Sequence, residues 1–414
     1  MRIISFILLS IVLHFAYTVT AQQTDTEGKN SIYQDVEFLS HDSLEGREIG
    51  TKGEVIAAQY IANRFAEIGL RKPNSMNSYF QEFTKKISKN PHDTSTAFTI
   101  EGRNVIGILN PEGQGSIIIG AHYDHLGLGG EGSGSLSTEQ AIHNGADDNA
   151  SGVAGLLYLA EYFSKKNPRH SITFIAFTGE EKGLLGSNYF ANTTLSNSDD
   201  VSFMINMDMI GRLDDQRRLA IYGISTSPEF TSTMERVKRP TFQFAMDSSG
   251  IGPSDHTSFY LQDIPVLHFF TGQHEQYHKP EDDVELINFE GLKDVSLFIA
   301  KLVTKLDKSP DLPFTKTRDP NPTNEKRKFN VTLGVIPDYL YDGVGLKIDG
   351  VKEGRSAAAA GIQKGDILLE LGQFKIASIY DYMEALGYYQ PEDAVSVMVE
   401  RDNEQIVLDL TFLK

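Results

Sequence analysis

The stretch that decides the fold is residues 171–181, which read SITFIAFTGEE. Its first seven residues form an apolar run of the kind found in buried strands of parallel sheets. Gly179, Glu180 and Glu181 follow almost directly. Open α/β sheets present their sites outside the carboxyl ends of the strands, so acids at this position indicate a functional site rather than an exposed acidic pair.

Four other segments place a histidine or carboxylate at the end of an apolar run or beside glycine. They are AHYD (121–124), GADDN (145–149), NMDM (206–209) and YH (277–278). Two histidines and three carboxylates, one of them shared, satisfy two Zn²⁺ ions and leave room for a bridging water. Glu180 then remains free beside a ligand and can act as a base. The five segments together predict a two-zinc hydrolase.

A short carboxylate is the natural bridge between two ions, because each of its oxygens can take one metal. Asp147 and Asp148 are both candidates, and Asp148 is favoured because it lies closer to the helix-forming run 149–163. The same residues could instead cap that helix, since Asp and Asn are good N-caps. The four partner segments favour the metal site.

These segments resemble the co-catalytic zinc aminopeptidases of metallopeptidase family twenty-eight, the bacterial leucine aminopeptidase type, over residues 31–308. The resemblance implies an α/β fold of the zinc exopeptidase (phosphorylase/hydrolase-like) kind, with a mixed, mostly parallel sheet and helices on both faces. It also implies two Zn²⁺ per chain. The implied metal ligands are His122, Asp148, Glu181, Asp208 and His278, with Asp148 bridging.

The same resemblance implies roles for three further residues. Glu180 falls on the general base, and Asp124 falls on a carboxylate that orients a ligand imidazole. Tyr277 falls where some members place a hydroxyl that stabilises the tetrahedral oxyanion. Family members also carry a cis peptide bond after the bridging aspartate, so we predict one between Asp148 and Asn149.

Other polar residues near the motifs receive no direct role. Asp255 matches a family segment near the cleft, and Arg47 is expected to serve packing. His268 lies in the apolar run 264–270, which favours a structural, hydrogen-bonded histidine. The remaining histidines that could line the cleft are His125, His143 and His256.

Periodicity supports the expected fold. Strand-like runs alternate with helical patterns, which indicates a mostly parallel sheet covered on both faces. The strand-like runs are 104–109, 116–120, 172–177, 202–208 and 264–270, and the helical patterns are 53–69, 151–163, 228–238 and 288–305.

Composition excludes several classes of partner. The net charge of −18 disfavours nucleic acid and anionic membranes, which need a basic face. We find no P-loop, and the glycines of 127–134 lack the strand–turn–helix setting of a dinucleotide loop. That glycine-rich stretch is expected to be a mobile loop at the cleft edge.

The first 21 residues have the pattern of a signal peptide. Met1 and Arg2 precede an apolar stretch, and 19–21 fit the small-residue cleavage rule, so the mature chain is expected to start near Gln22. No membrane span is expected after it. The sequence has no cysteine, which removes both disulfides and a lipoprotein anchor. We therefore expect export to a bacterial periplasm or secretion.

Two further regions follow the expected peptidase domain of residues 22–308. Residues 309–327 are rich in proline and charge and are expected to form a linker. Residues 328–414 resemble a PDZ domain, a small β-rich module, through LGV (333–335), GRSAAAAGI (354–362) and KGDIL (364–368). Such a domain takes a peptide C-terminus as an added strand, with 333–335 as the candidate loop. The alternative is a module that only packs on the catalytic domain.

The resemblance implies a zinc-dependent exopeptidase, most simply an aminopeptidase acting on peptides with a free N-terminus through a metal-bridging water and the Glu180 base. A glutaminyl cyclase shares the fold but uses one zinc and has Trp before the final ligand histidine, where this chain has Tyr277. A carboxypeptidase would need arginines for the substrate carboxylate, and the nearby candidates are Arg212, Arg217 and Arg218. A binding protein without metals is disfavoured, because all five ligands and the base are present.

Overall fold

The computed structural model describes residues 31–413, apart from a set of short gaps. The gaps are 88–97, 131–132, 136–139, 196–200, 238–241, 310–311, 318–330, 339–340, 342, 352–353 and 378. The expected signal peptide, residues 1–21, lies outside the described residues. In the part that is described, no helix combines the length and apolar character that a bilayer crossing needs.

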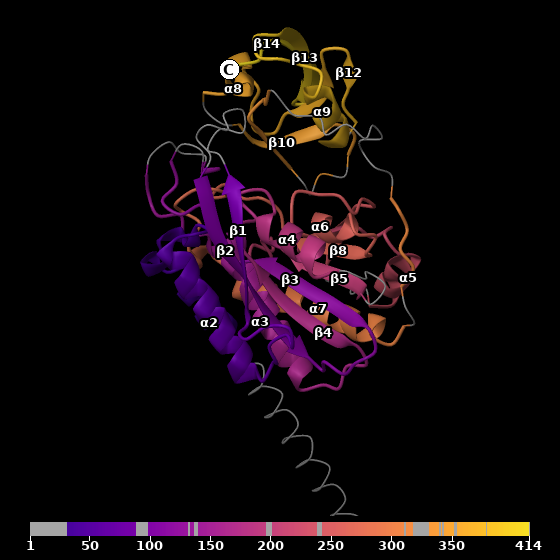
Figure 1. The fold of residues 1–414 in the computed structure, drawn as a ribbon. Coiled ribbons are helices and arrows are strands. Elements are labelled where there is room, and N and C mark those ends of the chain that lie inside the picture. The colour runs from indigo at the N-terminus through magenta and orange to yellow at the C-terminus, as the bar shows by residue number, and fades with distance from the viewer. Residues whose placement is uncertain are drawn as a thin grey trace, which may run out of the picture.

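Eight strands of the described residues form the larger sheet, in the order β1-β2-β4-β3-β5-β8-β6-β7 (Figure 1). The central strands β4, β3, β5 and β8 pair in parallel, whereas β1, β2 and β6 attach by antiparallel pairing. The mixed, mostly parallel sheet is therefore confirmed. The bounds are β1 Phe80–Ile87, β2 Phe98–Leu109, β3 Ser116–His122, β4 Ser171–Phe177, β5 Val201–Met207, β6 Arg218–Tyr222, β7 Gln243–Met246 and β8 Val266–Phe270.

Four helices lie within one residue of the predicted patterns at each end, whereas the helices 185–193 and 256–260 were not predicted. In the first long helix, the Thr51 side chain accepts a hydrogen bond from the Glu54 backbone, and Gly69 ends the helix at a φ of 90°. The bounds are α2 Lys52–Ile68, α3 Gly152–Ser164, α4 Leu185–Thr193, α5 Pro228–Val237, α6 His256–Tyr260 and α7 Phe289–Leu306. Short turns η1 Asp42–Arg47, η3 Ala146–Ser151 and η5 Val284–Leu286 complete the domain.

Both faces of the sheet are buried. Ile117 and Ile119 of β3 belong to the core that packs with α2, α3 and α7, whereas Ile118 faces the core shared with α4 and α6. Successive strand residues point to opposite faces, so a strand buried on both sides must be apolar throughout. Each such side chain contributes about 1.5–3 kcal/mol by burial. The continuous apolar run that the sequence shows is thus a requirement of this position.

The smaller C-terminal unit has its own antiparallel sheet and its own core. Its strands run in the order β14-β13-β11-β10-β9, and β12 pairs with β11. Leu333, Leu368 and Val397 are among the fully buried residues of its core. The bounds are β9 Val335–Pro337, β10 Leu346–Val351, α8 Ser356–Ala360, β11 Ile367–Leu371, β12 Phe374–Lys375, α9 Ile379–Leu386, β13 Ala394–Arg401 and β14 Glu404–Thr411.

The prediction that residues 309–327 form a linker is wrong for part of that segment. Leu312 is buried in the main core, and Phe314 packs against Tyr260 of α6 at a ring-centroid distance of 5.4 Å. The Thr317 backbone N–H donates to the Tyr260 hydroxyl at 2.9 Å. Apolar side chains among the prolines find an uncovered surface on the domain, so residues 312–317 are an anchored extension of the peptidase domain.

Candidate metal centre

The predicted ligands come from the carboxyl ends of the parallel strands. His122 is the last residue of β3, and Asp208 directly follows β5. Glu180 and Glu181 lie just beyond the end of β4, and His278 lies in the loop after β8. Because these four strands are neighbours in the sheet, residues that are far apart in sequence meet at one edge.

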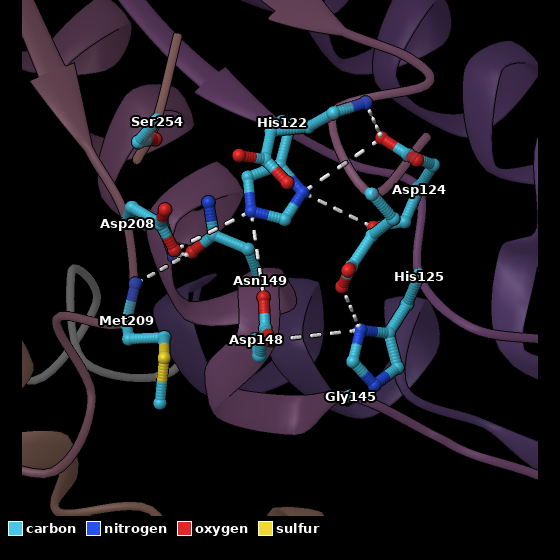
Figure 2. Close-up of polar contacts among 12 residues, drawn as sticks. His122, Asp124, His125, Gly145, Asp148, Asn149, Asp208, Met209 and Ser254 are labelled. Atoms are coloured by element: carbon cyan, nitrogen blue, oxygen red, sulfur yellow. Dashed lines mark hydrogen bonds and ion pairs between the residues drawn. The ribbon is translucent and has the colours of Figure 1, made fainter. Parts of the chain in front are cut away.

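Asp148 lies at the centre of the cluster. Its Oδ1 is 3.4 Å from His122 Nε2, which is itself 3.3 Å from Asp208 Oδ1 (Figure 2). Its Oδ2 is 3.3 Å from His278 Nε2, which is 3.4 Å from Glu181 Oε2. Each oxygen of one carboxylate thus faces a separate group of donors.

These separations fit two zinc ions. Zinc binds nitrogen and oxygen at about 2.0–2.2 Å in a tetrahedron, whose edges are then about 3.3 Å long. The four donor separations of 3.3–3.4 Å match this edge. The structure therefore brings together all five predicted ligands in an arrangement suited to two ions that share Asp148.

The choice of Asp148 over Asp147 agrees with the structure. Asp147 Oδ1 accepts a hydrogen bond from the Gly211 backbone at 2.7 Å, and its Oδ2 lies 3.3 Å from His274 Nε2. Asp147 therefore supports the site from outside the donor cluster. The cis peptide bond predicted between Asp148 and Asn149 is present.

Two buried charges hold the turn that carries Asp148. The Asp282 Oδ2 atom accepts hydrogen bonds from the backbone N–H groups of Asp147 and Asp148, both at 3.0 Å. On the other side, the Arg47 guanidinium donates to the carbonyls of Asn144 and Gly145 at 2.6 and 3.0 Å. The backbone N–H groups of the turn are therefore held by the Asp282 carboxylate, and its carbonyl groups are held by the Arg47 guanidinium.

Arg47 also reaches beyond this turn. Its Nε donates to the Tyr123 carbonyl at 2.8 Å, beside ligand His122, and its Nη1 donates to the Leu39 carbonyl. The side chain is 1% exposed. Burial lowers the pKa of Arg47 to about 10, while Asp124 and the nearby site carboxylates act in the opposite direction. The packing role predicted for Arg47 is thus refined: it fastens both ligand-bearing segments.

Asp124 lies where the resemblance implied. Its carboxylate is 3.7 Å from His122 Nδ1, and its Oδ1 accepts a hydrogen bond from the Glu180 backbone at 3.1 Å. The Asp124 backbone carbonyl lies 3.2 Å from the same His122 nitrogen. The hydrogen-bond partner of the imidazole is therefore the Asp124 backbone carbonyl, while the Asp124 carboxylate positions the segment that carries Glu180.

Glu180 and Tyr277 line the cavity above the donor cluster. Burial raises the pKa of the Glu180 carboxyl well above its usual value; the neighbouring acids Glu181 and Asp208 add to this, and His122 opposes it. A carboxylate with a raised pKa is suited to taking up and returning a proton near neutral pH. Tyr277 stacks on His278 with ring centroids 3.8 Å apart.

His125 lies closer to the centre than a residue that only lines the cleft. Its Nδ1 is 2.9 Å from Glu181 Oε1 and 3.8 Å from Asp148 Oδ2. His125, Asp148 and Glu181 could by themselves hold an ion. His278 contacts the other oxygen of Glu181, however, so His125 is suited to orienting Glu181 while His278 completes the donor set.

Three other histidines lie outside the donor cluster, although His268 also lines the cavity of the metal centre. His256 and His268 stack with ring centroids 4.4 Å apart, both buried, and Asn206 Nδ2 lies 3.0 Å from His268 Nδ1. His143 Nε2 lies 2.8 Å from the Ser135 hydroxyl. The hydrogen-bonded role predicted for His268 is confirmed.

Part of the glycine-rich stretch 127–134 also departs from its expected role. The Gly134 carbonyl lies 3.1 Å from His278 Nδ1. The neighbouring residues Ser133 and Ser135 are buried. These described residues support a ligand histidine. This contact leaves no signal in the sequence, because it joins residues 144 positions apart.

Comparisons with known proteins agree with this geometry. Residues 104–303 match the family described as peptidase family M28, and residues 316–411 match the PDZ domain family. The aminopeptidase YwaD of Bacillus subtilis is 28% identical over 236 residues, which are 53% of this chain and 48% of that protein. The uncharacterized protein YfbL of Escherichia coli is 26% identical over 251 residues, 52% of this chain and 76% of that protein. The chain thus spans about half the length of YwaD.

Two solved structures share the fold. An aminopeptidase from Aneurinibacillus sp. strain AM-1 has a TM-score of 0.52 and 19% identity, covering 70% of this chain and 95% of that one. The glutaminyl cyclase of Porphyromonas gingivalis has a TM-score of 0.53 and 20% identity, covering 67% and 98%. At this identity the likeness concerns the fold alone.

The sheet order and the donor cluster define a zinc exopeptidase-type hydrolase fold. The family matches are more specific: the chain contains a peptidase family M28 domain over residues 104–303 and a PDZ domain over residues 316–411.

Proposed function

We propose that this protein is a two-zinc aminopeptidase. The observation that carries the proposal is the position of Asp148, whose two oxygens face two separate donor groups at 3.3–3.4 Å. A site for one ion would not need both oxygens in this way. Glu180, which lines the same cavity, supplies the base.

Two zinc ions, when bound by the five ligands, would polarise a peptide carbonyl and increase the acidity of a water. The protein groups do the remaining work. Glu180 accepts the proton of the attacking water and returns it to the leaving amine. Tyr277 directs its hydroxyl toward the oxyanion that forms at the carbonyl. Asp124 keeps the His122 imidazole oriented throughout.

The wall of the cavity supports an exopeptidase that accepts an apolar N-terminal residue. Apolar and aromatic side chains line it together with the acidic cluster. The acids attract a free amine, while the apolar side chains bury an aliphatic or aromatic side chain. The apolar residues are Met209, Tyr222, Pro253, Phe270 and Tyr277.

The test measures metal content and substrate range together. We expect about two zinc ions per chain by elemental analysis, and hydrolysis of leucine 4-nitroanilide but not of its N-acetylated form. One zinc with full activity would favour a glutaminyl cyclase instead. Equal cleavage of free and acetylated substrates would remove the aminopeptidase assignment.

Two adjacent residues provide a matched pair of variants. Glu180→Gln removes the base but no ligand, so we expect a loss of kcat of at least about 10³-fold with zinc content retained. Glu181→Gln removes a ligand, so we expect zinc to fall toward one ion per chain. Equal zinc loss in both variants would contradict the assignment.

We further propose that the protein is exported and that its C-terminal domain binds peptide termini at the loop 333–335. The buried anchor 312–317 supplies a control for testing this domain. Truncation after Thr317 should leave a stable, active peptidase domain, whereas truncation after Lys308 should destabilise it by removing Leu312 and Phe314. An insoluble product in both cases would show that the C-terminal domain serves packing. Secretion of the full chain and a mature N-terminus near Gln22 would test export.

A further inference from the structure

A second cavity adjoins the metal centre and has no part in the chemistry described above. It measures about 400 Å³ and lies between the segment that follows ligand Asp208 and the loop that follows β8. Gln273 lines both this cavity and the one above the metal centre. Gln273 is therefore part of the wall of both spaces. The other lining residues are Arg212, Leu213, Asp214, Asp215, Arg218, Thr271, Gly272, His274, Leu286 and Asn288.

Three polar side chains at this cavity contain buried atoms that lack hydrogen-bond partners among the described residues. They are Arg212 Nη1, Gln273 Oε1 and His274 Nδ1. Arg212 is held by one bond only on its other nitrogen, where Nη2 donates to Gln276 Oε1 at 3.2 Å. A buried polar group without a partner costs about 1–3 kcal/mol. Such groups gathered at one cavity point to a polar ligand.

The charges at the cavity favour an anion. Arg218 is neutralised by Asp214, with Nε 2.5 Å from Oδ2. Arg212 has no carboxylate within ion-pair distance in the described part of the chain, so its charge is available. His274 is paired as Arg218 is, with its Nε2 3.3 Å from Asp147 Oδ2; although burial lowers the pKa of this imidazole, Asp147 raises it above its usual value. Asp215, which is exposed, is the acid that opposes an anion here.

We propose that this cavity binds the terminal carboxylate of a short peptide whose N-terminal residue occupies the metal centre. The inference rests on the proposed aminopeptidase function, and it adds a substrate class: di- to tetrapeptides with a free C-terminus. A planar guanidinium pairs with a carboxylate through two parallel hydrogen bonds, which makes Arg212 the anchoring residue. Gln273 lies between the two spaces, where the peptide would pass.

The experiment compares Leu-Gly, Leu-Gly-Gly and Leu-Gly-Gly-Gly, each as the free acid and as the C-terminal amide. At one length or more, we expect kcat/KM for the acid to exceed that for the amide by at least about tenfold, which corresponds to about 1.4 kcal/mol. Ratios within twofold of one at every length in the wild-type protein would overturn the proposal, with no variant needed.

Arg212→Met should bring the acid-to-amide ratio to within about twofold of one, and Arg212→Lys should retain part of it. Arg236 on α5 is exposed and donates to Thr233 at 3.0 Å, so Arg236→Met is the matched control for losing one positive charge. We expect it to keep the wild-type ratio. An unchanged ratio in Arg212→Met would also overturn the proposal.

A binding measurement separates this subsite from catalysis. In the zinc-loaded Glu180→Gln protein, calorimetry should give an acid peptide a Kd at least about tenfold below that of its amide, and adding Arg212→Met should remove the difference. Leucine 4-nitroanilide has no carboxylate and reports on the aminopeptidase function alone. If the anilide is hydrolysed but free-acid peptides are not preferred over their amides, only the carboxylate subsite is contradicted. If neither the anilide nor the peptides are hydrolysed, both proposals are contradicted.

Discussion

The turn 144–149 and the loop 271–283 both contribute to the metal centre, but the fold holds them differently. In the turn, Asp147 and Asn149 are fully buried and Asp148 is 3% exposed. Hydrogen bonds from Arg47 and to Asp282 fix the backbone of the turn on both sides. In the loop, the His278 side chain is 15% exposed and its Nδ1 contacts the Gly134 carbonyl.

This difference separates stability from metal occupancy. The turn is built from buried charges with dense hydrogen bonding, so changes there act on the folded state itself. The loop supplies a candidate ligand from a more exposed position, so changes there are expected to act first on the second of the two proposed zinc ions. Four predictions sharpen or break this contrast, in order of decreasing effect.

The largest effect should come from Arg47→Met. Four backbone carbonyls lose their donor, at about 1–3 kcal/mol each, so the metal-free protein should lose at least about 4 kcal/mol of unfolding free energy. Urea denaturation of the metal-free protein measures this loss, with the exposed Arg236→Met variant as a control that should change by less than about 0.5 kcal/mol. A loss below about 1 kcal/mol would mean that Arg47 does not organise the turn.

His278→Ala, in the loop 271–283, should lower metal occupancy rather than stability. We expect zinc content to fall from about two to about one ion per chain and kcat to fall by about 10²-fold, or about 2.7 kcal/mol. The urea midpoint of the metal-free protein should fall by less than in Arg47→Met, because the His278 side chain is 15% exposed, although it contacts Asp148, Glu181 and the Gly134 carbonyl. A destabilisation as large as that of Arg47→Met would erase the distinction between the two regions.

Asp282→Asn tests how the loop 271–283 and the turn 144–149 are connected, because Asp282 belongs to the loop but accepts hydrogen bonds from the backbone of the turn. The amide retains one accepting oxygen but loses the second, so we expect about 1–2 kcal/mol less stability. Zinc affinity should fall at both ions, since both share Asp148. If zinc affinity falls only at the ion that His278 binds, the hydrogen bonds that Asp282 accepts from the turn do not position Asp148.

The smallest effect concerns pH. Burial lowers the pKa of His278, but Glu181 and Asp148 outweigh burial and raise it to about 9 in the metal-free protein. Zinc must displace that proton, so zinc affinity should weaken as pH falls below 9, by up to about tenfold, or about 1.4 kcal/mol, per unit. Chelator competition at pH 6.5, 7.5 and 8.5 measures the slope. The dependence of zinc affinity on pH should be shallower in His278→Ala. An equal slope in this variant and the wild type would mean that zinc displaces a proton from a group other than His278.

Much of the fold followed from the chain itself. The apolar run before Glu180 gave a central strand, and Thr51 and Gly69 gave the ends of the first long helix. The donor residues were equally visible, because ligands at strand ends stand beside apolar runs and glycines. These features are local, and local features survive in a linear sequence.

The supports of the site were not visible. Asp282 stands in an acidic stretch that looks exposed, and Arg47 stands in a turn whose importance comes from carbonyls about a hundred residues away. Leu312 and Phe314 were hidden among prolines for the same reason. Each acts through a partner that only the folded chain brings near.

The sequence by itself therefore pointed to the candidate donor residues and to the strands that present them, because strand burial and donor chemistry leave a pattern in neighbouring residues. Only the tertiary structure showed that the two Asp148 oxygens face separate donor groups, that Arg47 and Asp282 hold the turn that carries Asp148, and that Gln273 lines a second cavity. The physical reason is that hydrogen bonds and cavities depend on distances between atoms of distant segments, and those distances are set when the sheet assembles.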